Sequence, residues 1–265
     1  MRKLMMMAAS LLIFAALFAT AASATDAPKT DKLARAKLAE QSGDLARIHG
    51  NFDLAASYYQ AAVRGDRRNC ILYNKLGIVE LQMSQKDELL GNTEFQSGER
   101  AMARKNFQQA LKCDPQSSSA VNNLGTVALL EKRYKIAVDF FKQSLAMDES
   151  SASTHVNLAE AWMGMKEVDR AMTEYARALE LDADVLSDNQ GGSQIQLTSP
   201  EQRARIDYLI AKSYIKRGNL DGALDYLGRA KELHYPDLAK VYSEPDFAPL
   251  WKDPRLAKIV KPKAL

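Results

Sequence analysis

The sequence predicts an all-α protein built from repeated helical hairpins, and three observations support this prediction. A small residue recurs in five segments at spacings of 34, 48, 34 and 52, at Gly43, Gly77, Gly125, Ala159 and Ala211. A large, mostly aromatic residue follows each of them, at Tyr59, Phe107, Phe141, Tyr175 and Leu227. Glycine (13) and proline (8) are too sparse for an all-β chain with many tight turns. A period near 34 residues is typical of arrays in which each hairpin buries its apolar face against its neighbours.

Residues 1–24 have the pattern of an export signal. Arg2 and Lys3 precede an apolar stretch that runs from Leu4 to about Ala19, and Ala22-Ser23-Ala24 ends it with small residues. We expect cleavage after Ala24 and a periplasmic or secreted bacterial protein; an uncleaved membrane anchor is the alternative. A disordered linker is expected over residues 25–31, and no later segment is expected to insert into a membrane.

The repeated segments resemble tetratricopeptide repeats (TPRs). The matching motifs include Gly50-Asn51-Phe52-Asp53-Leu54-Ala55, Gly218-Asn219-Leu220-Asp221-Gly222-Ala223 and the ending Leu111-Lys112-Cys113-Asp114-Pro115. The resemblance implies a right-handed superhelical solenoid of about five helix–turn–helix hairpins. The first four units fall within residues 32–182, at 36–69, 70–117, 118–151 and 152–185, and the fifth covers 200–235. Gly50 and Gly218 suit the positive φ that ends a helix.

The period is interrupted twice. Residues 84–97 add 14 residues to the second unit, and the turn signal Gly91-Asn92 divides them into about 7 for each helix, or two helical turns. We expect a hairpin that projects by ~10 Å. It is either a contact arm that uses Leu89, Leu90 and Phe95 or a plain solvated extension. Residues 183–199, rich in Gly, Ser and Asn, read as a flexible loop, and Ser199-Pro200 reads as the start of the next helix.

Four prolines divide residues 236–265 into short helices, and apolar side chains lie between them. The simplest role for this segment is a C-terminal cap over the open end of the solenoid. Trp251 is expected to pack in that cap, with an exposed recognition residue as the alternative.

No local motif for catalysis, a cofactor or a metal is present. His49, His155 and His234 lack partners at metal-ligand spacing, and the chain carries no nucleophile elbow or phosphate loop. Cys70 and Cys113 open and nearly close the second unit. An oxidising compartment would permit a disulfide between them, with two separately buried thiols as the alternative.

The net charge of +3 falls to +1 without Arg2 and Lys3, so no attraction to nucleic acid is expected. The resemblance implies a concave groove that binds a peptide or helix of another protein. Carried over by register, its lining would be Asn74, Ile78, Leu81, Asn122, Thr126, Leu129, Val156, Glu160, Met163, Tyr208 and Lys212. We therefore expect a non-enzymatic scaffold of the cell envelope or secretion machinery. The alternative is an enzyme or enzyme accessory that acts on envelope substrates such as peptidoglycan.

Overall fold

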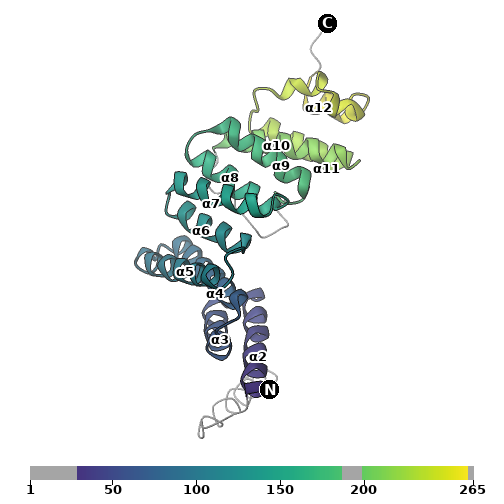
Figure 1. Ribbon diagram of the computed structural model, residues 1–265. Helices are drawn as coiled ribbons and strands as arrows, with labels where there is room; N and C mark the ends of the chain where they lie inside the picture. Colours follow the sequence, from purple (N-terminus) through teal and green to yellow (C-terminus); the bar gives the residue numbers. More distant parts are fainter. Residues whose placement is uncertain (1–28, 187–198, 262–265) are drawn as a thin grey trace, which may run out of the picture. The chain divides into compact units, whose positions relative to one another are not determined.

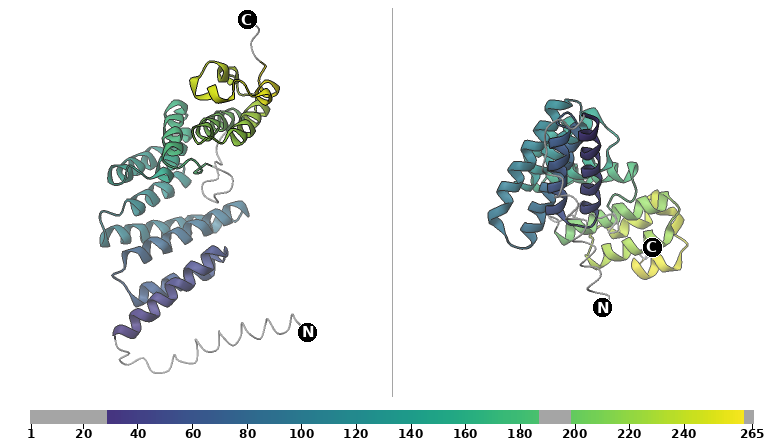
Figure 2. Two further views of the ribbon diagram at one scale, coloured as in Figure 1. Left: turned by 90° about the vertical axis from the view of Figure 1, so that its right-hand side faces the viewer. Right: turned by 90° about the horizontal axis from the view of Figure 1, so that it is seen from below.

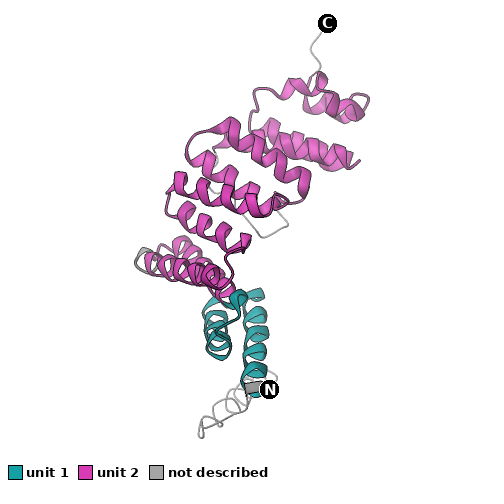
Figure 3. Cartoon of the chain, viewed as in Figure 1, with its two compact units in different colours: residues 1–72 teal, residues 73–265 magenta. Residues whose placement is uncertain are grey.

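The computed structural model describes residues 29–186 and 199–261, which form two compact units, residues 1–72 and 73–265 (Figures 1 and 3). The predicted signal peptide and most of the loop at 183–199 lie outside the described residues. Regular structure in the described chain is entirely helical. No helix in that part of the chain is both long and apolar enough to cross a membrane.

The first unit holds one hairpin, made of α2 (Lys29–Ile48) and α3 (Phe52–Gly65). Helix α2 begins at Lys29, so the expectation of a disordered linker was wrong for residues 29–31. Asp31 explains the early start, because its carboxylate lies in the first turn and pairs with Arg35 at 2.6 Å. A Cβ atom on Gly43 would lie 2.7 Å from the ring of Tyr59, so glycine is what lets the two helices approach.

The second unit begins within α4 (Cys70–Leu89) and contains four hairpins (Figure 2). Helix α4 is followed by α5 (Thr93–Cys113), α6 (Ser118–Leu130), α7 (Tyr134–Met147), α8 (Ala152–Gly164), α9 (Val168–Leu181), α10 (Pro200–Lys216) and α11 (Leu220–Glu232). The expected Ser199 cap is present as a capping box with Gln202. With the hairpin of the first unit, the described chain therefore contains the five hairpins that the repeat predicts.

The repeated small and aromatic residues pack against each other inside the hairpins of the second unit. A Cβ atom would lie 2.6 Å from the Phe107 ring at Gly77 and 2.5 Å from the Phe141 ring at Gly125. Both phenylalanines are fully buried. The recurring pair is thus the contact that sets how closely the two helices of a hairpin pack.

The turns between paired helices repeat one conformation. Gly50 and Gly218 have φ values of +71° and +76°, as predicted, and Lys132 and Lys166 adopt positive φ at the same register. In each turn the next amide donates to a carbonyl five residues back, as from Arg133 to Ala128 at 2.8 Å. This geometry strains lysine but not glycine.

The predicted extension of the second unit is confirmed. Helices α4 and α5 have 20 and 21 residues, whereas α6 and α7 have 13 and 14, so each helix gains 7 residues, or about 10 Å. Arg100 fastens this arm (residues 84–97), donating to Ser84 at 2.9 Å and to Glu88 at 2.6 Å. Leu89 and Leu90 are exposed at the turn; the side chain of Phe95 lies outside the described residues.

The C-terminal segment forms the predicted helical cap, with η1 (Leu238–Tyr242), η2 (Pro245–Leu250) and α12 (Pro254–Ile259). Four of its side chains are fully buried, namely Val241, Phe247, Leu250 and Leu256. They join the core of the preceding repeats. Trp251 is partly exposed at 44%, and its indole Nε1 donates to the Val241 carbonyl at 2.8 Å.

Candidate functional site

The eleven residues predicted to line a groove fall into two groups. Five are buried in the core and present no surface to a partner, which corrects their assignment: Leu81, Leu129, Val156, Met163 and Tyr208. The register carried over from the repeat family identified the helices on which these residues lie. It did not show which of their side chains are buried. The other six are partly exposed, namely Asn74, Ile78, Asn122, Thr126, Glu160 and Lys212.

Two of these six residues, Asn74 and Asn122, belong to a hydrogen-bonded row of four asparagines, the asparagine row. Asn157 on α8 donates through Nδ2 to Asn122 on α6 at 3.0 Å, and Asn122 donates to its neighbour Asn123 at 3.3 Å. Asn123 in turn donates to Asn74 on α4 at 2.9 Å. The row therefore links the first helices of three consecutive repeats.

Sequence reasoning found two members of the row and missed Asn123 and Asn157. Both stand two residues before the recurring small residue, at Gly125 and Ala159, one position after the register that was used. The signal in the sequence was that an asparagine lies two residues before the recurring small residue in both of these units. Among the described residues, each amide nitrogen of the row makes at most one hydrogen bond to another side chain, although it carries two donors.

Lys212 is committed to the cap. Its ammonium pairs with Glu244 and lies 3.6 Å from Asp246, and it stands 5.5 Å from the centre of the Tyr208 ring. Tyr208 also packs on Phe247, with ring centroids 5.0 Å apart. This pair therefore joins α10 to the C-terminal segment and is not available to a peptide ligand.

Glu160, on α8, is a strongly perturbed carboxyl group. Burial raises its pKa to about 8, and its Oε1 atom has no hydrogen-bond partner among the described residues. The charge of Glu160 and burial together raise the pKa of the Tyr175 hydroxyl, with burial the larger cause. Burial likewise raises the pKa of Glu80, on α4, to about 7. The two carboxyl groups lie on different first helices and belong to separate surroundings.

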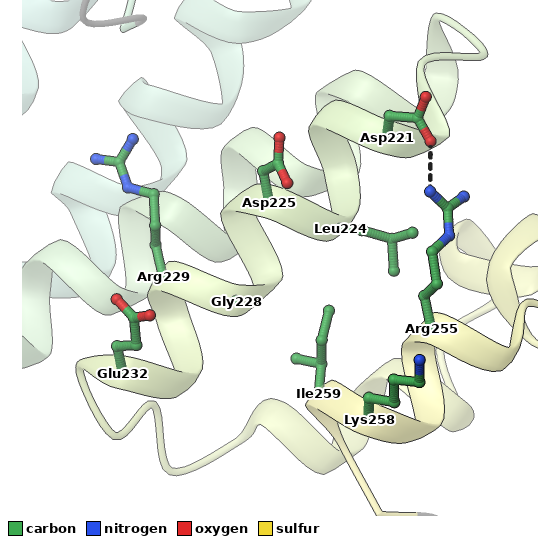
Figure 4. Close-up of a pocket in the computed structure, with 9 residues that line it drawn as sticks. All are labelled: Asp221, Leu224, Asp225, Gly228, Arg229, Glu232, Arg255, Lys258 and Ile259. Carbon is green, nitrogen blue, oxygen red and sulfur yellow. Dashed lines mark hydrogen bonds and ion pairs between the residues drawn. The ribbon is translucent and has the colours of Figure 1, made fainter.

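A cavity of about 500 Å³ lies between α11 and the cap (Figure 4). It is lined by Asp221, Leu224, Asp225, Gly228, Arg229, Glu232, Arg255, Lys258 and Ile259. Arg255 spans its edge and donates to Asp221 at 2.7 Å. No residue of the predicted groove and neither perturbed carboxyl group lines this cavity, which belongs to the seam between the last repeat and the cap.

Both cysteines of the chain are disulfide-bonded, and neither is a free thiol. The alternative of two separately buried thiols is therefore wrong. The described residues contain no group of three or more potential metal ligands. His155 instead pairs with Glu174, with Nδ1 at 2.7 Å from Oε2.

Comparisons with known proteins identify the repeat. Two tetratricopeptide-repeat family models match residues 89–152 and 128–188. Anaphase-promoting complex subunit 6 of Arabidopsis thaliana is 37% identical over 90 residues, which are 32% of this chain and 17% of that protein.

Solved structures share the fold. TTC0263, a thermophilic TPR protein of Thermus thermophilus, superimposes with a TM-score of 0.50 at 16% identity, covering 77% of this chain and 93% of that one. MamA of Desulfovibrio magneticus RS-1 gives a TM-score of 0.47 at 18% identity, with coverage of 75% and 94%. The two family models, together with the contacts of Gly77 with Phe107 and of Gly125 with Phe141, identify residues 89–188 and their neighbouring hairpins as tetratricopeptide repeats.

Proposed function

We propose that this protein is a non-enzymatic scaffold of the cell envelope or secretion machinery and that it binds a peptide or helix of a partner along α4, α6 and α8. Tetratricopeptide repeats are in general protein-interaction scaffolds without catalytic activity.

The asparagine row carries the proposal. It places four half-buried amides across three repeats. The partly exposed Ile78 and Thr126 lie four residues after Asn74 and Asn122 on the same helices. A backbone presents alternating N–H and C=O groups, and a side-chain amide offers both a donor and an acceptor to match them. An extended segment is therefore the guest that this surface fits best.

The test is affinity capture from envelope extract of the source cell, with the protein as bait. A variant carrying Asn122→Ala and Asn157→Ala is expected to lose the captured partner. Its matched control carries Gln108→Ala and Gln143→Ala, two exposed amides on the second helices α5 and α7. Thermal melts establish that both variants are folded. Equal capture by the two variants would remove the asparagine row from the function.

Export is part of the same proposal. It rests on the charged start, the apolar stretch and the Ala22-Ser23-Ala24 ending, and an oxidising compartment suits a chain whose cysteines are disulfide-bonded. N-terminal sequencing of the protein from the periplasmic fraction is expected to begin at Thr25. A protein recovered only from the cytoplasm with Met1 or Arg2 at its start would contradict export.

A further inference from the structure

Helix α2 carries an uncharged stripe on the side opposite Gly43. Its large side chains are Leu38, Leu45 and Ile48, which are 61%, 59% and 71% exposed. Ala34 and Gln41 complete the series 34, 38, 41, 45 and 48, whose alternating steps of four and three residues keep all five on one face. This α2 stripe has the spacing that is typical of a seam between two packed helices.

The stripe occupies registers that are buried in later repeats. Leu38 lies five residues before the recurring small residue, and Leu45 lies two residues after it. Residues at these two registers are at most 8% exposed in α6, α8 and α10: Ala120, Val127, Thr154, Ala161, Ile206 and Ser213. At the same two positions of α2, Leu38 and Leu45 are exposed to solvent.

The cause of the burial in later repeats is the helix that precedes each of them. Helix α6 packs on α5, α8 on α7 and α10 on α9. Helix α2 is the first described helix, so no described helix packs on this face. The α2 stripe thus continues the interface that joins successive repeats, with its covering helix absent from the described chain.

The last repeat, unlike the first, is covered by another part of the described chain. The cap packs on α11, where Leu224 is buried and Arg255 reaches Asp221. Head-to-tail stacking needs an open face at both ends of an array, and this end is closed. A contact that uses the same face on both partners, related by a twofold axis, needs only the α2 stripe.

We propose that two copies of this chain associate through α2, packed antiparallel across a twofold axis with the α2 stripes in contact. Antiparallel packing opposes the two helix dipoles, which is the favourable arrangement for two neighbouring helices. A single pair of facing helices offers little surface compared with a standard specific interface, so the dimer is weak. This inference does not depend on the guest proposed for the asparagine row.

Sedimentation velocity on the chain purified from its own host, at about 1 to 200 µM, measures the association. The parent is expected to shift from monomer to dimer across this range. Leu45→Glu weakens the dimer at least about tenfold, because it buries a carboxylate in an apolar seam. Leu89→Glu changes a leucine that is 72% exposed elsewhere and serves as the matched control with unchanged association.

A cross-linking experiment checks the geometry independently. The native cysteines are disulfide-bonded, so a single Gln41→Cys substitution supplies the reactive thiol, and mild oxidation is expected to yield a covalent dimer. Gln85→Cys, on exposed surface of the arm, is expected to yield none. A parent that stays monomeric throughout, or a dimer insensitive to Leu45→Glu, overturns the proposal; a helix from another protein or from residues 1–28 would then be the occupant of the stripe.

Discussion

Two glycines in this chain have the same local conformation and opposite surroundings. Gly98 lies in α5 with no atom within 4 Å of a Cβ placed on it, whereas a Cβ on Gly125 in α6 would lie 2.5 Å from Phe141. Both residues are helical, so alanine would improve helix propensity equally at each site. The difference between the two substitutions therefore measures the packing of the hairpin alone.

We expect Gly98→Ala to raise the free energy of unfolding by about 0.5–1 kcal/mol. Gly125→Ala is expected to lower it by about 1–2 kcal/mol, because Phe141 is fully buried and must shift at a cost that exceeds the propensity gain. Urea titrations followed by circular dichroism give both values. Equal effects of the two variants would mean that the glycine–aromatic contact does not determine the spacing of the helices.

Glu160 makes stability depend on pH. Its folded-state pKa of about 8 lies above the ordinary value of 4.5, so the folded state holds a proton that the unfolded state releases. The contribution of protonated Glu160 to the free energy of unfolding is fully present below pH 4.5. It is lost as the pH rises toward and through 8, at a rate of at most about 1.4 kcal/mol per pH unit. Glu80 contributes in the same direction up to about pH 7.

Glu160→Gln is therefore expected to raise the melting temperature at pH 8.5 and to leave it nearly unchanged at pH 5. Thermal melts across this range give the profile. Glu180→Gln, at an exposed carboxylate on α9, is the control and should keep the slope of the parent. A Glu160→Gln profile parallel to that of the parent would contradict the raised pKa.

At the scale of elements, the arm is the feature that sequence arithmetic predicted best. The 14 extra residues divide evenly, and the turn moves from the register of Gly98 to Gly91, seven residues earlier. Gly98 keeps the register of Gly50 and Gly218 although it now lies inside a helix. The sequence thus retains a turn residue for the shorter hairpin.

Deletion of residues 84–97 is expected to leave a folded array, with Gly98 taking the positive φ that Gly50 and Gly218 show. Circular dichroism should report a loss of helix that matches the missing residues, together with a cooperative melt. Deletion of residues 84–90 alone shortens only α4, leaves two turns of α5 without a partner and should be much less stable. A shorter deletion that proves as stable as the longer one would contradict the paired extension.

At the scale of the whole molecule, the cap stabilises the end of a one-dimensional array. Stability in such arrays is the sum of repeat and neighbour terms, so damage at one end is felt most strongly nearby. Leu250 is fully buried in the cap and belongs to the same core as the residues of α10 and α11. A cavity there should loosen the last hairpin first.

Leu250→Ala is expected to cost about 2–5 kcal/mol, with faster hydrogen exchange concentrated in α10 and α11 and little change in α6. Hydrogen exchange followed by mass spectrometry resolves these segments. Trp251→Ala, at the neighbouring and partly exposed position, should cost less. A uniform rise in exchange across the second unit would show instead that the repeats unfold as a single block.

The sequence predicted the hairpins because a small residue and a large, mostly aromatic residue recur at fixed spacing where the two helices of each hairpin meet. It predicted the candidate site less well. Leu129 and Val156 share a first helix with Asn122 and Asn157 respectively, and only the packing of neighbouring repeats decides which side chains stay accessible. Lys212 was misassigned because its partners, Glu244 and Asp246, come from a distant segment with no repeat pattern.

The even division of the arm also limits how this hairpin can change in length. Helices that gain seven residues each return to nearly the same rotational phase, so the paired faces still meet after two turns. An insertion of three or four residues in only one of the two helices would leave the added residues without a partner on the other helix, so the apolar faces of α4 and α5 would no longer match. The turn at Gly91-Asn92 is therefore a site where this hairpin can be lengthened in steps of about 14 residues, 7 for each helix, without changing the packing of the repeats.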